Sequence, residues 1–124
     1  MTVAAKFVGI EEQNKNYKVS SRKWVAKGTD LFVKEFTLEN GEEVPWHTHS
    51  NVFDIFYCIG GRLTIEHMDN KGGTKLDPIQ LSVGDSAKIE VGSPHRPFNP
   101  GPEACRFLII QGVGAYDFPP FKPD

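Results

Sequence analysis

Cysteine is scarce in this sequence, which contains only Cys58 and Cys105. Two cysteines cannot build the disulfide framework of a small secreted domain, and they lack the paired spacing of a zinc ribbon. Unpaired cysteine is among the most frequently buried residue types. We therefore expect both residues to be buried thiols.

An excess of charge and long hydrophobic runs are also missing. Fourteen Lys and Arg nearly balance sixteen Asp and Glu, for a formal net charge of -2, so no electrostatic field favours binding to nucleic acid or anionic membranes. No apolar run approaches the length of a membrane span, and the first residues lack a basic region followed by a long apolar core. We expect a cytoplasmic protein with neither nucleic acid nor membrane as a partner.

No segment shows convincing helical periodicity, and no internal repeat is present. Short β-prone runs are separated instead by turns rich in Gly, Pro and Asn, which indicates an antiparallel sandwich or barrel. A chain of 124 residues with nine Phe suits one domain, residues 1–124, with a modest core. The expected strands are residues 3–10, 17–26, 31–38, 45–49, 55–59, 62–68, 79–81, 87–91 and 104–110.

One turn is predicted with particular force. Asn40-Gly41 lies between apolar runs, and both residue types tolerate the positive φ angles of a tight hairpin. We expect residues 45–49 to return from this turn as a strand beside residues 31–38.

The return segment carries the chemistry. His47 and His49 are separated by one residue, so on an extended segment both imidazoles project to the same side, as chelating ligands do. The carboxylate of Asp54 follows after a short polar step, and His95 lies in a Gly-rich turn further along the chain. These four residues are the candidate metal ligands.

Two stretches of the chain resemble the signature motifs of the cupin superfamily. The first motif is matched by Gly41, His47, His49, Asp54 and Gly61, and the second by Gly84, Gly92, His95 and Asn99. Asp54 stands where the family usually has glutamate, and Glu90 where it usually has proline. The resemblance implies a jelly-roll barrel in which the four candidate ligands point inward, with Phe36, Phe56, Cys58 and Phe107 as the apolar lining.

The departure at Asp54 leaves two interpretations open. Its side chain is one methylene shorter than glutamate, so it either binds the metal directly or orients a ligand histidine through a hydrogen bond. Cys58, on the same strand face, is expected to be a core thiol, with a role as ligand or reactive thiol as the alternative. His67 is expected at the surface, and Asn99 is expected to fix the turn after His95.

Imidazole and carboxylate ligands suit first-row divalent ions, and the carboxylate favours Fe or Mn over Ni or Zn. Three nitrogens and one oxygen leave up to two octahedral positions for substrate. The sequence therefore favours a metal-dependent dioxygenase, lyase or isomerase acting on a small oxygenated molecule. The alternative is a non-catalytic module that binds or senses a small ligand and has a structural metal. A homodimer is expected, with Trp24, Trp46, Tyr57 and residues 118–121 as candidate surface.

Overall fold

The computed structural model describes residues 9–11, 17–69 and 73–123. Within these ranges the chain forms nine strands and no helix, and so contains no helix able to cross a membrane. The expected strand at residues 3–10 lies outside the described residues except at its end. The strands are β1 (Ile10–Glu11), β2 (Ser21–Lys27), β3 (Leu31–Leu38), β4 (Phe53–Gly60), β5 (Leu63–His67), β6 (Ile79–Leu81), β7 (Ser86–Ile89), β8 (His95–Phe98) and β9 (Cys105–Gly112).

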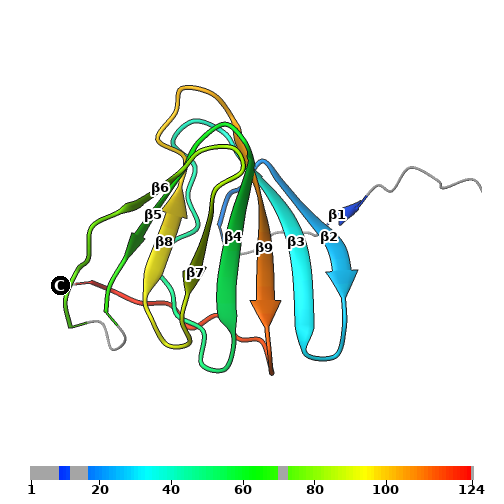
Figure 1. Ribbon diagram of the computed structural model, residues 1–124, viewed down its shortest axis with the longest axis vertical. Coiled ribbons are helices and arrows are strands. Elements are labelled where there is room, and N and C mark those ends of the chain that lie inside the picture. The colour runs from blue at the N-terminus through cyan, green and yellow to red at the C-terminus, as the bar shows by residue number, and fades with distance from the viewer. Residues whose placement is uncertain (1–8, 12–16, 70–72, 124) are drawn as a thin grey trace, which may run out of the picture.

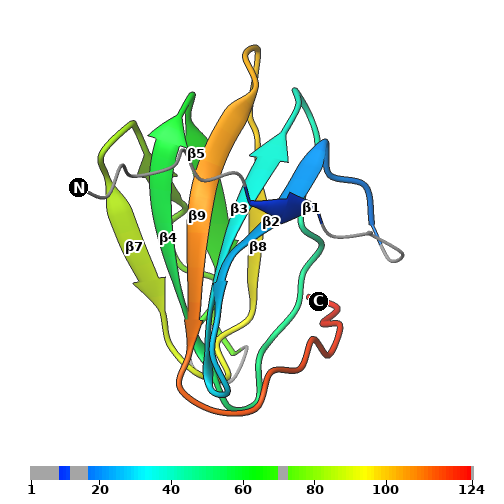
Figure 2. The same ribbon diagram turned by 90° about the vertical axis from the view of Figure 1, so that its right-hand side faces the viewer.

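The strands form two antiparallel sheets. One has six strands in the order β1-β2-β3-β9-β4-β7, and the other has three in the order β6-β5-β8. Figure 1 shows the smaller sheet beside β7 and β4, and Figure 2 shows the larger sheet from its outer side. This arrangement confirms the predicted all-β fold, an antiparallel sandwich of the jelly-roll barrel type.

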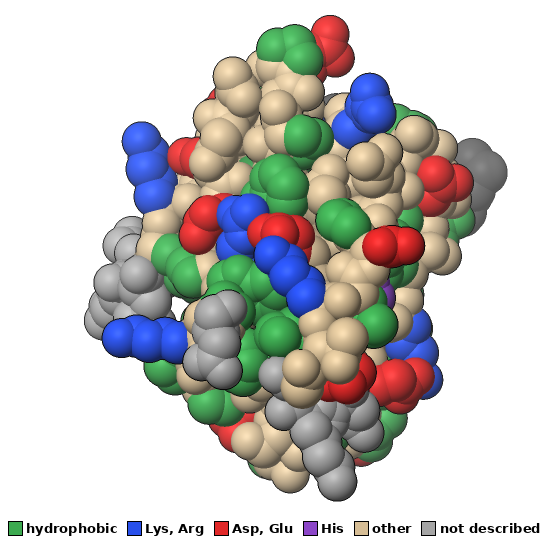
Figure 3. Space-filling view, turned by 90° about the vertical axis from the view of Figure 1, so that its left-hand side faces the viewer, with side chains coloured by type: hydrophobic (Ala, Val, Ile, Leu, Met, Phe, Trp, Pro, Cys, Tyr) green, Lys and Arg blue, Asp and Glu red, His purple; other side chains and the backbone are tan. Residues whose placement is uncertain are grey.

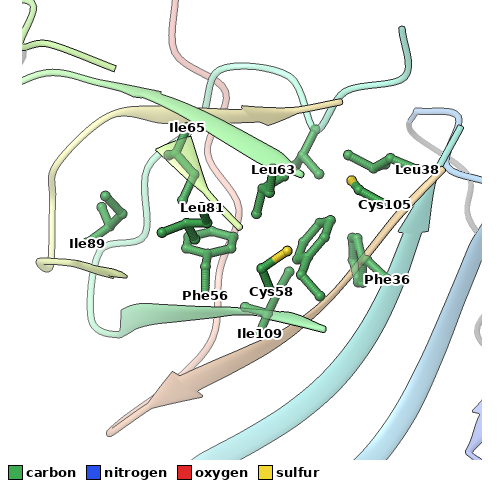
Figure 4. Close-up of a cluster of buried hydrophobic side chains, with 12 residues drawn as sticks. Phe36, Leu38, Phe56, Cys58, Leu63, Ile65, Leu81, Ile89, Cys105 and Ile109 are labelled. Atoms are coloured by element: carbon green, nitrogen blue, oxygen red, sulfur yellow. The ribbon is translucent and has the colours of Figure 1, made fainter. Parts of the chain in front are cut away.

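The hydrophobic core fills the space between the sheets. Alternate residues of β9, Cys105, Phe107 and Ile109, are buried while Arg106 is exposed, which is the two-residue period of a strand with one face in the core. The smaller sheet contributes three side chains that meet them (Figure 4). These are Leu63, Ile65 and Leu81. Both cysteines are free and buried in this core, as predicted.

The predicted hairpin partner is wrong, although the turn itself forms. Gly41 has a φ of 83°, and Glu42 N–H donates to Glu39 O over 3.0 Å. Beyond it, however, the chain crosses to the smaller sheet, because Gly41 N–H donates to Asn99 O and Asn99 N–H donates to Glu42 O. Residues 45–49 are therefore not a strand beside β3, whose neighbours are β2 and β9; one bridge, between His47 and His95, joins them to β8.

Strand β8 was not predicted, because Pro97 lies inside it and proline cannot donate a ladder hydrogen bond. The structure places β8 at the edge of the three-stranded sheet, paired with β5 alone among the named strands. An edge strand tolerates proline because one side of its backbone has no ladder partner to satisfy. This strand matters for the site, since it begins at His95.

The segment after β9 returns along the outside of residues 46–51. Thr48 N–H donates to Pro119 O over 3.0 Å, and Phe121 N–H donates to Trp46 O over 3.1 Å. Figure 2 shows the two segments running side by side. The histidine-bearing segment is thus held between β8 and the C-terminal segment.

Candidate metal centre

The structure brings together the four residues that the sequence singled out. His47 and His49 come from the segment between β3 and β4, Asp54 from β4, and His95 from the start of β8. All four are buried, with at most 2% of each side chain exposed. One potential ligand atom of each lies within 4.8 Å of those of the others. The group could hold a metal ion.

Each imidazole is fixed by a backbone carbonyl at its Nδ1 atom. The acceptors are Pro45 O for His47 at 2.7 Å, Asp117 O for His49 at 2.6 Å and Ser93 O for His95 at 2.9 Å. When Nδ1 donates its hydrogen to a carbonyl, a neutral ring keeps the lone pair on Nε2. The Nε2 atoms are therefore the ones available to a metal.

Asp54 reaches the imidazoles despite its short side chain. Its Oδ2 lies 3.1 Å from His49 Nε2 and 2.8 Å from His95 Nε2. Its other oxygen, Oδ1, accepts a hydrogen bond of 2.9 Å from Gln111 Nε2. Gln111 is buried and lies directly opposite Asp54 on the neighbouring strand β9. The carboxylate is thus held with one oxygen turned toward the histidines.

These spacings fit a single ion. Bonds of about 2.1 Å from a metal to nitrogen or oxygen put neighbouring ligand atoms of an octahedron about 3.0 Å apart and opposite ones about 4.2 Å apart. The observed Asp54 contacts of 2.8 and 3.1 Å match the shorter separation. The ligand atoms lie within 4.8 Å of one another, so a small inward movement brings the most distant pair to the separation of opposite ligands.

Burial and mutual charge set the protonation of these groups in the metal-free protein. Burial, followed by the nearby imidazoles of His95 and His49, lowers the pKa of His47 well below its usual value. For His49 burial acts in the same direction, but the hydrogen bond and charge of Asp54 outweigh it and raise the pKa. Burial would raise the pKa of Asp54, yet hydrogen bonds from His49 and His95 hold it far below the usual range. Asp54 is therefore a carboxylate, as a metal ligand must be.

A cavity of about 20 Å³ adjoins the cluster and is lined in part by His47, Asp54 and Gln111. Phe36 and Phe56 line it, as predicted. The other two predicted lining residues, Cys58 and Phe107, lie deeper in the hydrophobic core and are completely buried.

Burial raises the pKa of the Cys58 thiol, and that of Cys105 to about 12. Cys58 Sγ is turned toward the carbonyl oxygens of Gly60 and Gly61, each 3.6 Å away. Cys58 thus lies in the hydrophobic core and is not part of the four-residue cluster, which favours the core thiol over a metal ligand.

The C-terminal segment contributes contacts that the sequence did not indicate. The ring of Phe118 stacks on His47 with centroids 4.2 Å apart, and it also stacks on Tyr17 at 5.6 Å. Asp117 supplies the carbonyl that fixes His49, and its carboxylate accepts from Ser50 N–H at 2.8 Å. A backbone carbonyl has no residue-type signature, so no sequence signal marks Asp117. Phe118, which belongs to the segment predicted as a candidate dimer surface, is half-buried and lies against the site.

Two further predictions concern residues at the margin. Asn99 fixes the turn after β8, since its side chain donates to Leu38 O and Glu103 O and accepts from Gly101 N–H. His67 stands apart from the four-residue cluster, with its Nε2 atom 2.8 Å from Asp77 O.

Comparison with known proteins places this architecture. The family model described as "Cupin domain" matches residues 34–111, which include all four residues of the cluster. The chain belongs to the cupin family. No curated protein shows a significant sequence match to this cupin.

Several solved structures share the fold. A conserved protein with a double-stranded β-helix domain from Klebsiella pneumoniae aligns with a TM-score of 0.68 and 24% identity, covering 86% of this cupin and 82% of that chain. A cupin-2 domain containing protein from Shewanella frigidimarina aligns with a TM-score of 0.60 and 26% identity, covering 77% and 82%. An oxalate oxidase aligns with a TM-score of 0.66 and 18% identity over 73% of this cupin, which spans only 46% of that chain.

Proposed function

We propose that this cupin is a metal-dependent enzyme that acts on a small oxygenated organic substrate, as a dioxygenase or as a lyase or isomerase. The observation that carries the proposal is the convergence of three Nδ1-anchored imidazoles and one fixed carboxylate beside a cavity. A site for small molecules needs both features.

His47, His49, His95 and Asp54 would hold a divalent ion, with iron or manganese favoured over nickel and zinc because of the carboxylate. When bound, such an ion polarises substrate oxygens and leaves up to two octahedral positions open. Gln111 keeps Asp54 in one orientation through its 2.9 Å hydrogen bond. The rings of Phe36, Phe56 and Phe118 line the cavity and limit the access of water to it.

The fold is compatible with more than one reaction class. Proteins named oxalate oxidase and oxalate decarboxylase both align with this cupin, at 18% and 19% identity. At such identities the likeness supports the fold and leaves the reaction open, because one scaffold hosts many chemistries. The reaction therefore has to be determined by assay.

A second function has its own support. The cavity of about 20 Å³ holds no more than a water molecule, and Phe118 covers His47. With so little room beside the histidines the metal would be structural, and a module that binds or senses a small ligand would hold it in the outer cavity of about 250 Å³ near Trp46. In that case the protein would bind ligand without turnover.

Metal analysis of protein purified without a His-tag is the first test, followed by assays for oxygen consumption and for product formation with a panel of small organic acids. The enzymatic proposal expects one first-row divalent ion per chain and turnover that disappears in His95→Ala. Metal and ligand binding without turnover would support the binding module. Protein that takes up none of iron, manganese, nickel and zinc would refute the enzymatic proposal.

A further inference from the structure

Arg22 is a buried cation for which the described residues provide no anionic partner. It lies on β2 opposite Phe36, on the face that points into the barrel, and only 9% of its side chain is exposed. In the part of the chain that the structure describes, its Nε and Nη2 atoms have no hydrogen-bond partner. The donors on these two nitrogens are therefore available to a ligand.

Aromatic rings hold the guanidinium in place. Its central carbon lies 4.6 Å from the ring centroid of Tyr17 and 5.0 Å from that of Phe36. These contacts attract the face of the cation, whereas its N–H groups point outward in the plane and need acceptors. The rings thus orient the group without satisfying its hydrogen bonds.

Arg96 shows how this chain treats an arginine with a structural role. Its Nη1 lies 2.6 Å from Glu43 Oε2, and its Nε donates to Glu66 Oε1 over 2.8 Å. Arg96 is more exposed than Arg22, yet it is paired with two carboxylates. Burying a charge without such pairing is costly, so the isolation of Arg22 calls for a ligand.

The position of Arg22 links it to the candidate metal centre. Tyr17 and Phe36, the two rings beneath its guanidinium, both line the cavity that reaches His47 and Asp54. Three steps between neighbouring strands, from β2 through β3 and β9 to β4, separate Arg22 from Asp54. This corresponds to about 14 Å between backbones along the sheet, and a small molecule that spans it must displace side chains that now leave a cavity of only about 20 Å³.

A second positive charge lines the same cavity. Lys34 is buried and precedes Phe36 by two residues, so it projects from the same face of β3. Its register partner is Trp24, which makes it a diagonal neighbour of Arg22. Its Nζ lies 4.3 Å from the Trp24 ring and 5.0 Å from the Tyr116 ring. Lys34 is thus a second cationic side chain on the inner wall formed by β2 and β3.

We propose that Arg22 binds a carboxylate of the substrate while the other end of the molecule reaches the metal. The substrate class is a small organic acid with a second oxygen function, such as a dicarboxylate. The inference rests on the proposed function only where it puts the other end of the substrate at the metal. A carboxylate offers two acceptors in the fork geometry that a guanidinium matches.

Titration calorimetry on the manganese-loaded protein tests the proposal with malonate, succinate and glutarate and with the monomethyl ester of each. At least one diacid should bind, and its ester should bind about tenfold to a hundredfold more weakly, the range expected for loss of a hydrogen bond to a charged group. Arg22→Leu should lose the same factor and keep its manganese, whereas Arg22→Lys should retain part of the affinity. Arg62→Leu removes an exposed arginine and should change nothing.

Unfolding of the metal-free protein provides a second test of the proposal that does not depend on the metal. If Arg22 lacks a partner within the chain, Arg22→Leu should unfold at an equal or higher urea concentration, because an apolar side chain replaces an unpaired charge. Succinate should stabilise the wild type and leave Arg22→Leu unaffected. A large loss of stability in Arg22→Leu would overturn the proposal, as would diacid binding that is unchanged by this substitution. Failure to bind any of manganese, iron, nickel and zinc would refute the proposed function instead, and the succinate effect on the metal-free protein would still decide the role of Arg22.

Discussion

Gln111 and Asp54 face each other across strands β9 and β4, and the amide nitrogen of Gln111 donates a 2.9 Å hydrogen bond to Asp54 Oδ1. Both side chains are buried, so water does not substitute for either partner. The bond turns Asp54 Oδ2 toward His49 and His95. One amide thus determines which carboxylate oxygen faces the candidate metal centre.

Gln111→Leu should weaken metal binding by about tenfold to a hundredfold, the usual effect of losing a group that orients a ligand. Asp54 would lose its fixed orientation, but all four candidate ligands would remain, so excess metal should still restore one ion per chain. Competition with a coloured chelator measures the affinity. Gln80→Leu, at an exposed position of β6, is the matched control. Equal affinities for the two variants would show that Gln111 has no part in metal binding.

Substitutions of Asp54 separate its two possible roles. If Asp54 binds the metal directly, Asp54→Ala should abolish stoichiometric metal and Asp54→Glu should preserve it, since glutamate is the usual residue of the family motif. If Asp54 only orients a histidine, Asp54→Ala should cost about tenfold to a hundredfold in affinity and still bind metal. Metal content by mass spectrometry distinguishes the outcomes. His95→Ala should be metal-free in both cases, and a full metal content in that variant would show that the centre is misplaced.

Much of the fold could be predicted from local patterns. The expected strands at residues 31–38 and 79–81 have the same limits as β3 and β6, because alternating side chains and flanking turns define both ends. Local patterns do not predict the segment with which the chain pairs after a turn. Asn40-Gly41 determines that the chain reverses, but contacts with Asn99 determine to which sheet it returns. A contact between residues so far apart in sequence leaves no local signal.

In the site, too, some residues have a local sequence signal and others do not. His47, His49, Asp54 and His95 could be grouped by spacing, whereas Asp117 contributes a carbonyl that any residue possesses. Two polar residues of the site, Lys34 and Gln111, do have a local signal in the sequence. Lys34 precedes Phe36 by two residues, and Gln111 follows Ile109 by two, so each polar side chain lies on the apolar face of its strand. A polar residue at a core position is the pattern that marks both of them.

Stability of the metal-free protein should pass through a maximum near pH 6.5. The pKa of His47 is lowered from its usual 6.5, so below that pH the unfolded chain takes up the proton more readily and stability falls. The pKa of His49 is raised from 6.5, so its stabilising contribution is complete below that pH and is lost as the pH rises through the raised value. Urea unfolding in the presence of a chelator gives the profile.

Bound metal should remove the alkaline decline, because a metal requires deprotonated imidazoles and binds more tightly as pH rises. His49→Asn in chelator should also lack this decline, whereas His67→Asn should keep it. Metal-free wild type whose stability continues to rise above pH 7 would contradict the sign assigned to His49.

A homodimer is a further prediction. Tyr57 projects from the outer face of β4 and is 41% exposed, and Ile10 and Leu31 are also exposed on the larger sheet. Figure 3 shows the face on the side of the smaller sheet, where acidic and basic side chains are interspersed among hydrophobic ones. We expect light scattering at micromolar concentration to give twice the chain mass and Tyr57→Lys to give the monomer. Wild-type protein that is monomeric at all such concentrations would remove the prediction.

The ring of Phe118 separates two spaces. The cavity of about 20 Å³ beside the histidines and an outer cavity of about 250 Å³ near Trp46 share Tyr17 and Phe118 in their walls. These two rings are stacked, with centroids 5.6 Å apart and planes 19° apart. Removing the ring of Phe118 should join the cavities and expose His47.

Phe118→Ala should therefore accelerate the release of bound metal to a chelator, and should lower stability by roughly 1 to 3 kcal/mol, less than the loss for a fully buried phenylalanine because Phe118 is half-buried. Stopped-flow measurement with a coloured chelator gives the release rate. Phe121→Ala is the matched control, because its ring belongs to the same segment but packs on Trp46. Phe118→Leu retains an apolar side chain without the stacked ring and should release metal at an intermediate rate. If Phe118→Ala and Phe121→Ala accelerate release equally, the C-terminal segment protects the site as a whole, and the ring of Phe118 has no separate role.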